Sequence, residues 1–221
     1  MKNIIRIALD GPSGSGKSTV AKELSKKLNI LYLDTGAMYR AVALKTLSLG
    51  LDTFDENAVS KFIDGIDLKI KYENGSQRTF LDGEDVSEKI REPGISMHAS
   101  NVSSLKCVRL KMVEMQRKIA SDMSCVLDGR DIGSFVLPDA DYKFYITAAV
   151  DVRAKRRMEE LIAKGFKVDF QELKKEIEKR DYNDKNRDFA PLRCAEDAVV
   201  IDTSDMNVNE VLDKILSYVK R

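Results

Sequence analysis

The feature that most restricts the fold is the glycine-rich segment Gly11-Pro12-Ser13-Gly14-Ser15-Gly16-Lys17-Ser18. It fits the pattern G-x-x-x-x-G-K-[ST], follows the short apolar run Ile4–Leu9 and precedes a stretch of helical spacing, Thr19–Leu28. A strand, a tight loop and a helix in this order form a P-loop, whose backbone N–H groups and helix N-terminus bind phosphate. The full pattern and its placement disfavour the alternative, a glycine-rich turn that binds nothing.

This loop is expected to bind ATP and Mg²⁺. Lys17 is predicted to reach the β- and γ-phosphates, and the Ser18 hydroxyl is predicted to ligate Mg²⁺. The donor-binding loop residues are Gly11, Pro12, Ser13, Gly14, Ser15, Gly16, Lys17, Ser18 and Thr19.

Apolar runs and helical stretches alternate along most of the chain. The predicted strands are 4–9, 31–33, 124–127, 143–146 and 198–201, and the predicted helices are 19–28, 37–49, 55–63 (N-capped by Asp55), 95–121 with room for one break, 152–164, 169–186 and 208–219. Strands that alternate with helices predict an α/β fold with a doubly wound parallel sheet.

One segment departs from this alternation. The runs 67–72 and 78–81 are separated by Glu73-Asn74-Gly75-Ser76, and Asn-Gly between alternating runs indicates a hairpin; a second turn follows at Asp82-Gly83. We expect residues 62–93, closed by Pro93-Gly94, to be an inserted lobe with a small antiparallel sheet. Residues 1–61 and 94–221 would then form the core domain.

The charge balance limits the partners. The 221-residue chain has 37 basic and 36 acidic residues and a net charge of +1, which supports neither a general grip on nucleic acid nor an anionic membrane surface. No apolar run reaches the roughly 18 residues of a membrane span, and the N-terminal apolar run is too short for a signal peptide. Cys107, Cys125 and Cys194 fit no zinc pattern and are expected to be buried or half-buried free thiols. We expect a cytoplasmic monomer.

Charged residues interrupt two apolar helix faces. The stripe of the helix 169–186 continues as Arg180, Asp184 and Arg187, which either project into a cleft or form a solvated helix end with an Arg180–Asp184 salt bridge. Arg109 falls among the apolar residues of the long helix, where it either extends its guanidinium to water or points into a site. His98 is assigned no catalytic role.

Polar clusters follow the predicted strands, where open parallel sheets bind ligands. Asp128-Gly129-Arg130-Asp131 follows the strand 124–127, and Asp34-Thr35-Gly36 follows 31–33, with Tyr39 and Arg40 one helical turn on. A surface turn is the alternative for each. The basic run Arg153, Lys155, Arg156 and Arg157 fits a solvated face, an RNA-binding patch or a mobile lid over a transferring phosphoryl group.

A P-loop alone does not separate motors, GTPases and kinases. The chain has no N-K-x-D guanine motif, and its size favours a small-molecule kinase.

Over nearly its whole length the chain resembles the bacterial cytidylate kinases of the nucleoside monophosphate kinase family. The matching segments are IALDGPSGSGKST (7–19), LDTGAMYRAVAL (33–44), GEDVS (83–87), IREPGIS (90–96), LDGRDIGSFVLPDAD (127–141), RAKRRMEEL (153–161), KGF (164–166) and RDYNDKNRDFAPL (180–192). Lys106 and Asn183 depart from the family pattern, and Asn183 puts one donor-side contact in question.

The resemblance implies a five-stranded sheet in the order 2-3-1-4-5, an inserted lobe that binds the nucleoside monophosphate, and a short lid at about 153–167. It implies that ATP phosphorylates CMP or dCMP. Arg156 and Arg157 are expected on the lid and donor side. The residues expected to act in catalysis are Lys17, Arg130, Arg156, Arg180 and Arg187.

The resemblance also assigns the acceptor site. It implies that Ser100, Arg109 and Asp131 read the cytosine edge, with Asp131 accepting from the exocyclic amine. It places Thr35 near the monophosphate, with Tyr39 beside it, and Asp184 on the sugar hydroxyls. The arginines expected around the acceptor phosphate are Arg40, Arg130, Arg180 and Arg187.

Two other readings remain open. One is a different small-molecule P-loop kinase, of the UMP/CMP, shikimate or dephospho-CoA type. The other is a non-catalytic nucleotide sensor or RNA-binding module.

Overall fold

The computed structural model describes residues 4–73, 75–92 and 94–219. The chain divides into two compact units. The first, here called the core unit, comprises residues 1–32, 123–186 and 190–221; the second, the insert unit, comprises 33–122 and 187–189. The insert unit contains the whole of the segment 62–93 and adds helices on either side of it.

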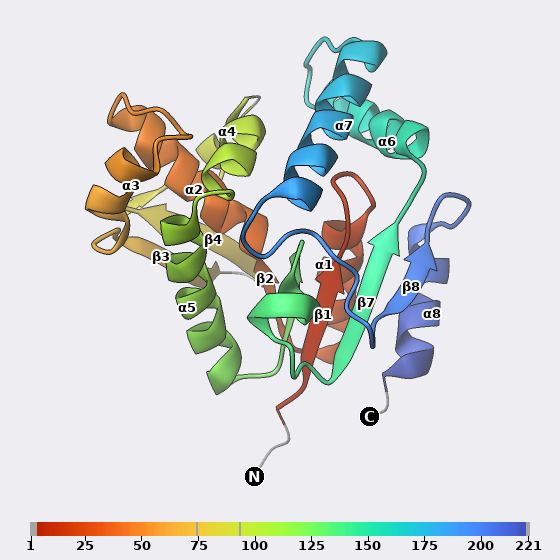
Figure 1. Cartoon of the computed structure of the whole chain (residues 1–221). Helices are drawn as coiled ribbons and strands as arrows, with labels where there is room; N and C mark the ends of the chain where they lie inside the picture. The colour runs from red at the N-terminus through yellow and green to blue at the C-terminus, as the bar shows by residue number, and fades with distance from the viewer. Residues whose placement is uncertain (1–3, 74, 93, 220–221) are drawn as a thin grey trace. The chain divides into compact units, whose positions relative to one another are not determined.

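A five-stranded sheet carries the P-loop (Figure 1). Its strands are β1 (Arg6–Asp10), β2 (Leu31–Asp34), β6 (Cys125–Gly129), β7 (Tyr142–Thr147) and β8 (Val199–Asp202). The order is β2-β6-β1-β7-β8, and β1 pairs in parallel with both β6 and β7. Numbered along the sheet-forming strands alone, this order is 2-3-1-4-5, so the predicted fold class is confirmed.

The helices of the core unit are α1 (Lys17–Leu28), α6 (Val150–Ala163), α7 (Phe170–Asn186) and α8 (Val208–Tyr218). The main apolar cluster joins the sheet to α1 and α8 through residues such as Leu24, Phe144 and Ile215. Helices α6 and α7 have a separate cluster of their own, formed by Ala154, Leu161, Leu173 and Ile177. This second cluster makes α6 and α7 a packed helix pair with its own core.

The insert unit contains α2 (Thr35–Ser48), α3 (Glu56–Ile63), β3 (Leu68–Glu73), β4 (Ser76–Leu81), β5 (Glu84–Asp85), the 3-10 turn η1 (Lys89–Arg91), α4 (Ile95–Val102) and α5 (Lys106–Asp122). Strands β3, β4 and β5 form the small antiparallel sheet that the sequence predicts. Helix α2 packs against α4, β4 and η1, and α3 packs against α5.

Local signals placed most boundaries correctly. The Asp55 carboxylate caps α3 by accepting from the N–H of Ala58 at 2.9 Å. The predicted break in the long helix lies between α4 and α5. Glu73 pairs with Ser76 across the first turn, and Asp82 and Gly83 have positive φ in the second. Asn74 and Pro93, which the turn predictions include, lie outside the described residues. The short π-helix η2 (Ile132–Val136) after β6 was not predicted.

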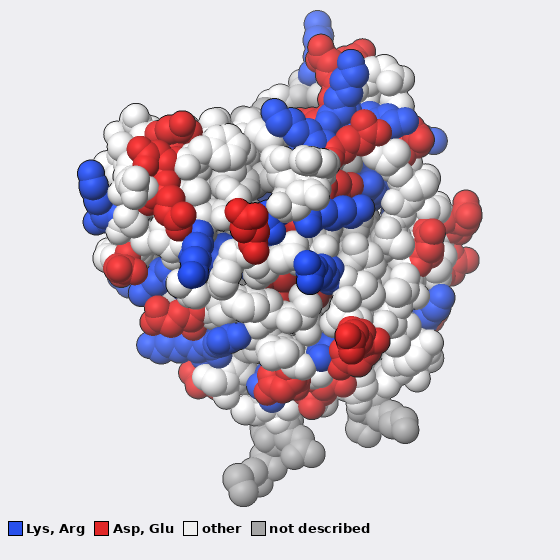
Figure 2. All heavy atoms as spheres, in the orientation of Figure 1, with Lys and Arg blue, Asp and Glu red and all other residues white. Residues whose placement is uncertain are grey.

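Within the described residues no helix combines the length and apolarity needed to cross a membrane. Basic and acidic side chains are interspersed over the face that Figure 2 shows, in line with the net charge of +1. The three cysteines are free thiols; Cys125 is buried and Cys107 half-buried, but Cys194 is exposed, so the prediction of burial is wrong for Cys194.

Candidate functional site

The P-loop joins β1 to α1 at the carboxyl end of the central strand. Gly11 has a φ of 143°, and a Cβ there would collide with the carbonyl oxygen of Ile146 in β7. Gly16, with a φ of 89°, precedes α1, which has no side-chain cap. The first N–H groups of α1 are therefore left for a ligand, as phosphate binding requires.

Lys17 is held inside the loop. Its side-chain Nζ donates to the carbonyl oxygen of Pro12 at 2.8 Å and lies 3.5 Å from Ser15 Oγ, and the residue is only 5% exposed. Burial and the nearby Arg130 lower the pKa of Lys17 to about 7, although the carboxylates of Asp128, Asp10 and Asp184 oppose the shift. The negative charge of a bound polyphosphate would favour the protonated form of Lys17 and raise its pKa again.

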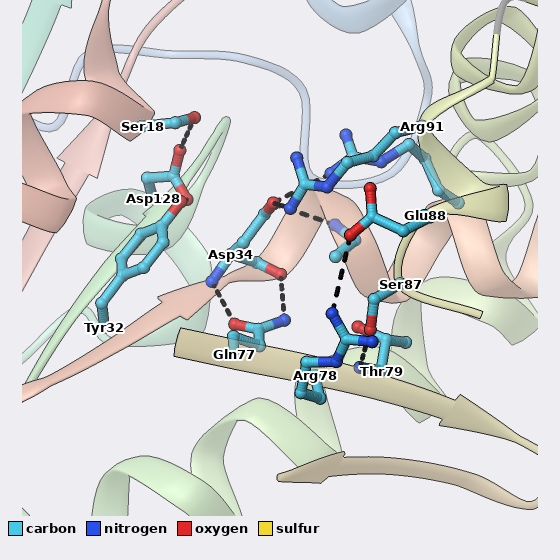
Figure 3. Close-up of polar contacts among 12 residues, drawn as sticks. Ser18, Tyr32, Asp34, Gln77, Arg78, Thr79, Ser87, Glu88, Arg91 and Asp128 are labelled. Carbon is cyan, nitrogen blue, oxygen red and sulfur yellow. Dashed lines mark hydrogen bonds and ion pairs between the residues drawn. The ribbon is translucent and has the colours of Figure 1, made fainter. Parts of the chain in front are cut away.

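Asp128 forms a short polar chain with the P-loop serine (Figure 3). Ser18 Oγ donates to Asp128 Oδ2 at 2.5 Å, and the Tyr32 hydroxyl donates to Asp128 Oδ1 at 3.1 Å. Hydroxyl and carboxylate oxygens are the hard donors that Mg²⁺ prefers, so this pair fits the ion that the P-loop implies. The sequence placed Asp128 in a strand-end cluster but gave it no role. Its signal was an acidic residue at the end of a strand predicted to lie in the same sheet as the P-loop strand.

The described residues contain no group of three or more His, Cys, Asp or Glu side chains that could hold a metal. Mg²⁺ at phosphate sites commonly takes one or two protein ligands and completes its shell with water and phosphate oxygens, so a two-residue site is sufficient.

Asp10, the last residue of β1, was missed entirely by the sequence reasoning. Its two carboxylate oxygens accept from the N–H groups of Ile132 and Gly133, each at 2.7 Å. Burial raises the pKa of Asp10 to about 7, and the two backbone hydrogen bonds oppose the rise. Asp10 thereby fixes the start of η2, directly after Arg130 and Asp131. A charged residue at the end of the strand, directly after the apolar run Ile7–Leu9, was the available signal.

Arg130 and Asp184 are brought together although 54 residues separate them. Arg130 Nε donates to Asp184 Oδ2 at 2.7 Å. The neighbouring carboxylate raises the pKa of Arg130 against the opposing effect of burial. Asp184 is buried, so at this position the charged continuation of the α7 stripe is not a solvated helix end. Arg180, one turn earlier on α7, is half-buried.

The basic run of α6 is only partly a solvated face. Arg153 is buried and pairs with Asp181 at 2.6 Å. Arg156 donates to Thr203 Oγ1 at 3.0 Å and to the Thr203 carbonyl at 2.6 Å. Arg157 pairs with Glu160 at 2.7 Å, and Lys155 is exposed. The interpretation of this run as a solvated face is therefore wrong for Arg153 and Arg156.

In the insert unit, Asp34 organises the polar residues near the start of α2 (Figure 3). Its Oδ1 accepts from the N–H of Ala37 at 2.9 Å and caps α2. Its Oδ2 pairs with Arg40 at 2.9 Å and with Arg91 at 3.5 Å. Gln77 of β4 accepts from the backbone N–H of Asp34 at 2.8 Å. The neighbouring Thr35 is buried.

Arg109 does not extend to water. It is 1% exposed, and its guanidinium carbon lies 5.3 Å from the centre of the Tyr39 ring, in cation–π range. Ser100 is also buried, and its hydroxyl has no hydrogen-bond partner among the described residues. Nε of Arg40 is likewise buried without a hydrogen-bond partner in the described part of the chain. His98 contacts Thr53 Oγ1 at 3.2 Å, which suits a structural role.

The predicted site residues thus divide between the two units. The core unit contains the P-loop, Arg130, Asp131, Arg156, Arg157, Arg180 and Asp184. The insert unit contains Thr35, Tyr39, Arg40, Ser100, Arg109 and Arg187.

Comparison with known proteins identifies close relatives. The sequence model of the family described as cytidylate kinase matches residues 7–221. A cytidylate kinase of Caldicellulosiruptor saccharolyticus is 50% identical over 212 residues, covering 96% of this chain and 94% of the relative. A cytidylate kinase of Halalkalibacterium halodurans is 46% identical over 216 residues, covering 98% and 97%. Among solved structures, an uncharacterized protein from Eubacterium ventriosum shares the fold, with a TM-score of 0.54, 20% identity and 97% coverage of both chains.

Proposed function

The chain belongs to the cytidylate kinase family, and from this premise we propose that it transfers the γ-phosphoryl group of ATP to CMP or dCMP, yielding ADP and (d)CDP. The observation that carries the proposal is the P-loop with Lys17 held inside it, in a chain whose relatives of nearly full length are cytidylate kinases.

The donor binds at the P-loop, residues 11–19, with Lys17 on the β- and γ-phosphates. Ser18 and Asp128 would hold Mg²⁺, because the hydroxyl and the carboxylate are hard oxygen donors that lie side by side at the P-loop. The ion, when bound, neutralises charge on the transferring phosphoryl group. Arg156, fixed against Thr203, and Arg157 act on the donor side, and residues 153–167 serve as a short lid.

The acceptor phosphate is surrounded by Arg40, Arg130, Arg180 and Arg187, and Thr35 and Tyr39 complete this part of the site. Ser100, Arg109 and Asp131 read the cytosine edge, and Asp184 holds the sugar. The buried hydroxyl of Ser100 supports this assignment, because an uncommitted buried polar atom is costly unless a ligand satisfies it.

Catalysis depends on position and charge. An oxygen of the acceptor phosphate attacks the γ-phosphorus in line, and the leaving ADP carries away the electron pair of the broken bond. A dianionic phosphate is already a competent nucleophile, so no strong general base is required. Lys17 and the arginines stabilise the negative charge, and lid closure excludes the water that would hydrolyse ATP.

The assignment of Asp131 as the base reader gives a direct test. Its carboxylate is expected to accept from the cytosine amine, so Asp131→Ala should lower kcat/KM for CMP by about 10²-fold or more and leave ATP binding unchanged. Steady-state kinetics with each substrate varied in turn measures both effects. Unchanged CMP turnover would remove Asp131 from base recognition.

We further propose that the chain acts in the cytoplasm as a monomer without nucleic acid. The balanced charge of the chain disfavours a general affinity for nucleic acid.

The function as a whole is tested by ADP formation from ATP and Mg²⁺ with CMP, dCMP, UMP, AMP or no acceptor. We expect turnover with CMP and dCMP well above that with UMP and AMP. Turnover with another acceptor would keep the phosphoryl-transfer residues and discard the base-reading ones. A folded chain that binds ATP without acceptor-dependent turnover would instead be a nucleotide sensor.

A further inference from the structure

A buried ion pair contacts the main chain of the P-loop at Ser13. Arg153 of α6 donates from Nη1 to the Ser13 carbonyl oxygen at 2.9 Å. Asp181 of α7 accepts from the Ser13 N–H at 3.4 Å, so both polar groups of one loop residue are engaged. Arg153 and Asp181 pair with each other at 2.6 Å, and their side chains are 7% and 11% exposed.

Arg153 is fixed on its other side as well. Its Nε donates to the Ala148 carbonyl oxygen at 2.9 Å, next to the start of α6. The loop also approaches the Arg153 backbone closely, because a Cβ added to Gly14 would lie 3.1 Å from both the Cβ and the carbonyl oxygen of Arg153. Three elements, the P-loop, α6 and α7, are therefore held together at this contact.

The helix pair does not need this ion pair for cohesion. Its apolar cluster, which includes Ala154 and Leu173, already packs α6 against α7. A buried ion pair often adds little or nothing to stability compared with apolar side chains of similar size. What the Arg153–Asp181 pair does specifically is to fix the backbone of Ser13. Ser13 lies in the P-loop between Gly11 and the N–H groups at the start of α1.

We propose that Arg153 and Asp181 are positioning residues that hold the P-loop in its donor-binding shape and tie it to α7, the helix that carries Arg180 and Asp184. The inference rests on the proposed function, since it concerns how this loop binds the donor. Arg153 does not act on the phosphates through its charge, because Asp181 neutralises its guanidinium. Donor affinity then depends on two residues that bind no part of the donor.

A second ion pair between the same helices provides a matched control. Lys174 of α7 pairs with Asp151 of α6 at 2.6 Å, with side chains 27% and 64% exposed. Within the described part of the chain, neither residue forms a hydrogen bond or ion pair with the P-loop. Asp151→Asn removes an α6–α7 ion pair without touching Ser13.

The test compares three variants with the control Asp151→Asn. The three are Asp181→Asn, Arg153→Lys, and a double variant that carries both Arg153→Met and Asp181→Leu. We expect the KM for ATP and the Kd for ADP to rise about tenfold in the first three, while the KM for CMP changes less than about twofold. The double variant should keep its melting temperature, because apolar side chains replace the buried pair. Asp151→Asn should change neither nucleotide constant.

Two results would overturn the proposal. One is a fall in melting temperature or active fraction with unchanged ATP and ADP constants, which would mark the pair as merely structural. The other is an equal rise of the ATP and CMP constants. Absence of CMP phosphorylation by the wild-type chain would refute the proposed function alone, since ADP titration still reports on the loop. A wild-type chain that does not bind ADP would overturn both.

Discussion

The P-loop side of the core unit and helices α4 and α5 of the insert unit hold their buried polar groups differently. In the core unit Lys17 donates to Pro12, Asp10 holds two backbone N–H groups, and Arg130 pairs with Asp184. In the insert unit the Ser100 hydroxyl and both ends of the Gln116 amide are buried without a hydrogen-bond partner among the described residues.

The difference suits two kinds of recognition. Phosphate is common to all nucleotides, so a loop that is fixed in advance can bind it. A nucleobase is distinguished by its hydrogen-bonding edge, and an uncommitted hydroxyl such as that of Ser100 would reject a base that leaves it unsatisfied. We infer that the insert unit gives up some stability for base recognition.

The largest expected effect comes from a substitution in the P-loop of the core unit. Lys17→Ala removes the buried amine that we propose to act on the transferring phosphoryl group, and we expect kcat to fall by about 10³-fold with the fold intact. ADP formation with CMP measures the loss, and circular dichroism checks the fold. Lys22→Ala, at an exposed position of the same helix, is the control. Retained turnover would exclude Lys17 from the mechanism.

The next largest effect comes from a substitution of a buried residue in the insert unit. Arg109→Met keeps the length of a buried side chain but removes its donors, and we expect the KM for CMP to rise about 10- to 100-fold. The KM for ATP should change little. Lys118→Met on the exposed face of α5 is the control. Equal changes for both substrates would contradict the division of labour.

How far the sequence predicted these sites depends on the distance between partners. The P-loop and the break before α5 follow from local pattern, whereas the strand order came from the family resemblance. The burial of Arg109 was open in the sequence as one of two alternatives, because periodicity assigns a residue to a helix face without showing what packs against it. Asp10 was missed because the N–H groups that it accepts from lie 122 and 123 residues away. Arg153 was assigned to the lid because its contact with the Ser13 carbonyl spans 140 residues. The π-helix η2 has no simple sequence period.

A third prediction concerns pH in the core unit. The pKa of Asp10 is raised from 3.8 to about 7, so across this window the folded chain keeps a proton that the unfolded chain releases. The free energy of unfolding should therefore fall as pH rises through it, by up to about 1.4 kcal/mol per pH unit from this group.

Urea unfolding of the wild type and Asp10→Asn at about pH 5, 6 and 7 measures this slope. Asparagine does not titrate, so the variant should lack the contribution. The same slope in both proteins would show that other groups cause it.

The last prediction concerns the buried polar groups of the insert unit. Gln116→Met removes a buried amide whose two polar atoms have no hydrogen-bond partner among the described residues, and should stabilise the chain by about 1–3 kcal/mol with the KM for CMP unchanged. Ser100→Ala should also stabilise, but should raise the KM for CMP about tenfold. Urea unfolding and steady-state kinetics measure the two quantities. A kinetic effect of Gln116→Met as large as that of Ser100→Ala would contradict the distinction.

The most direct test of separate donor and base recognition is calorimetric titration of ADP and of CMP, each alone, into the wild type, Lys17→Ala and Arg109→Met. The account predicts a crossed pattern: Lys17→Ala loses affinity for ADP and keeps that for CMP within about threefold, while Arg109→Met does the reverse. Loss of both nucleotides in both variants would contradict it, because donor and base would then not be recognised by separate sets of residues.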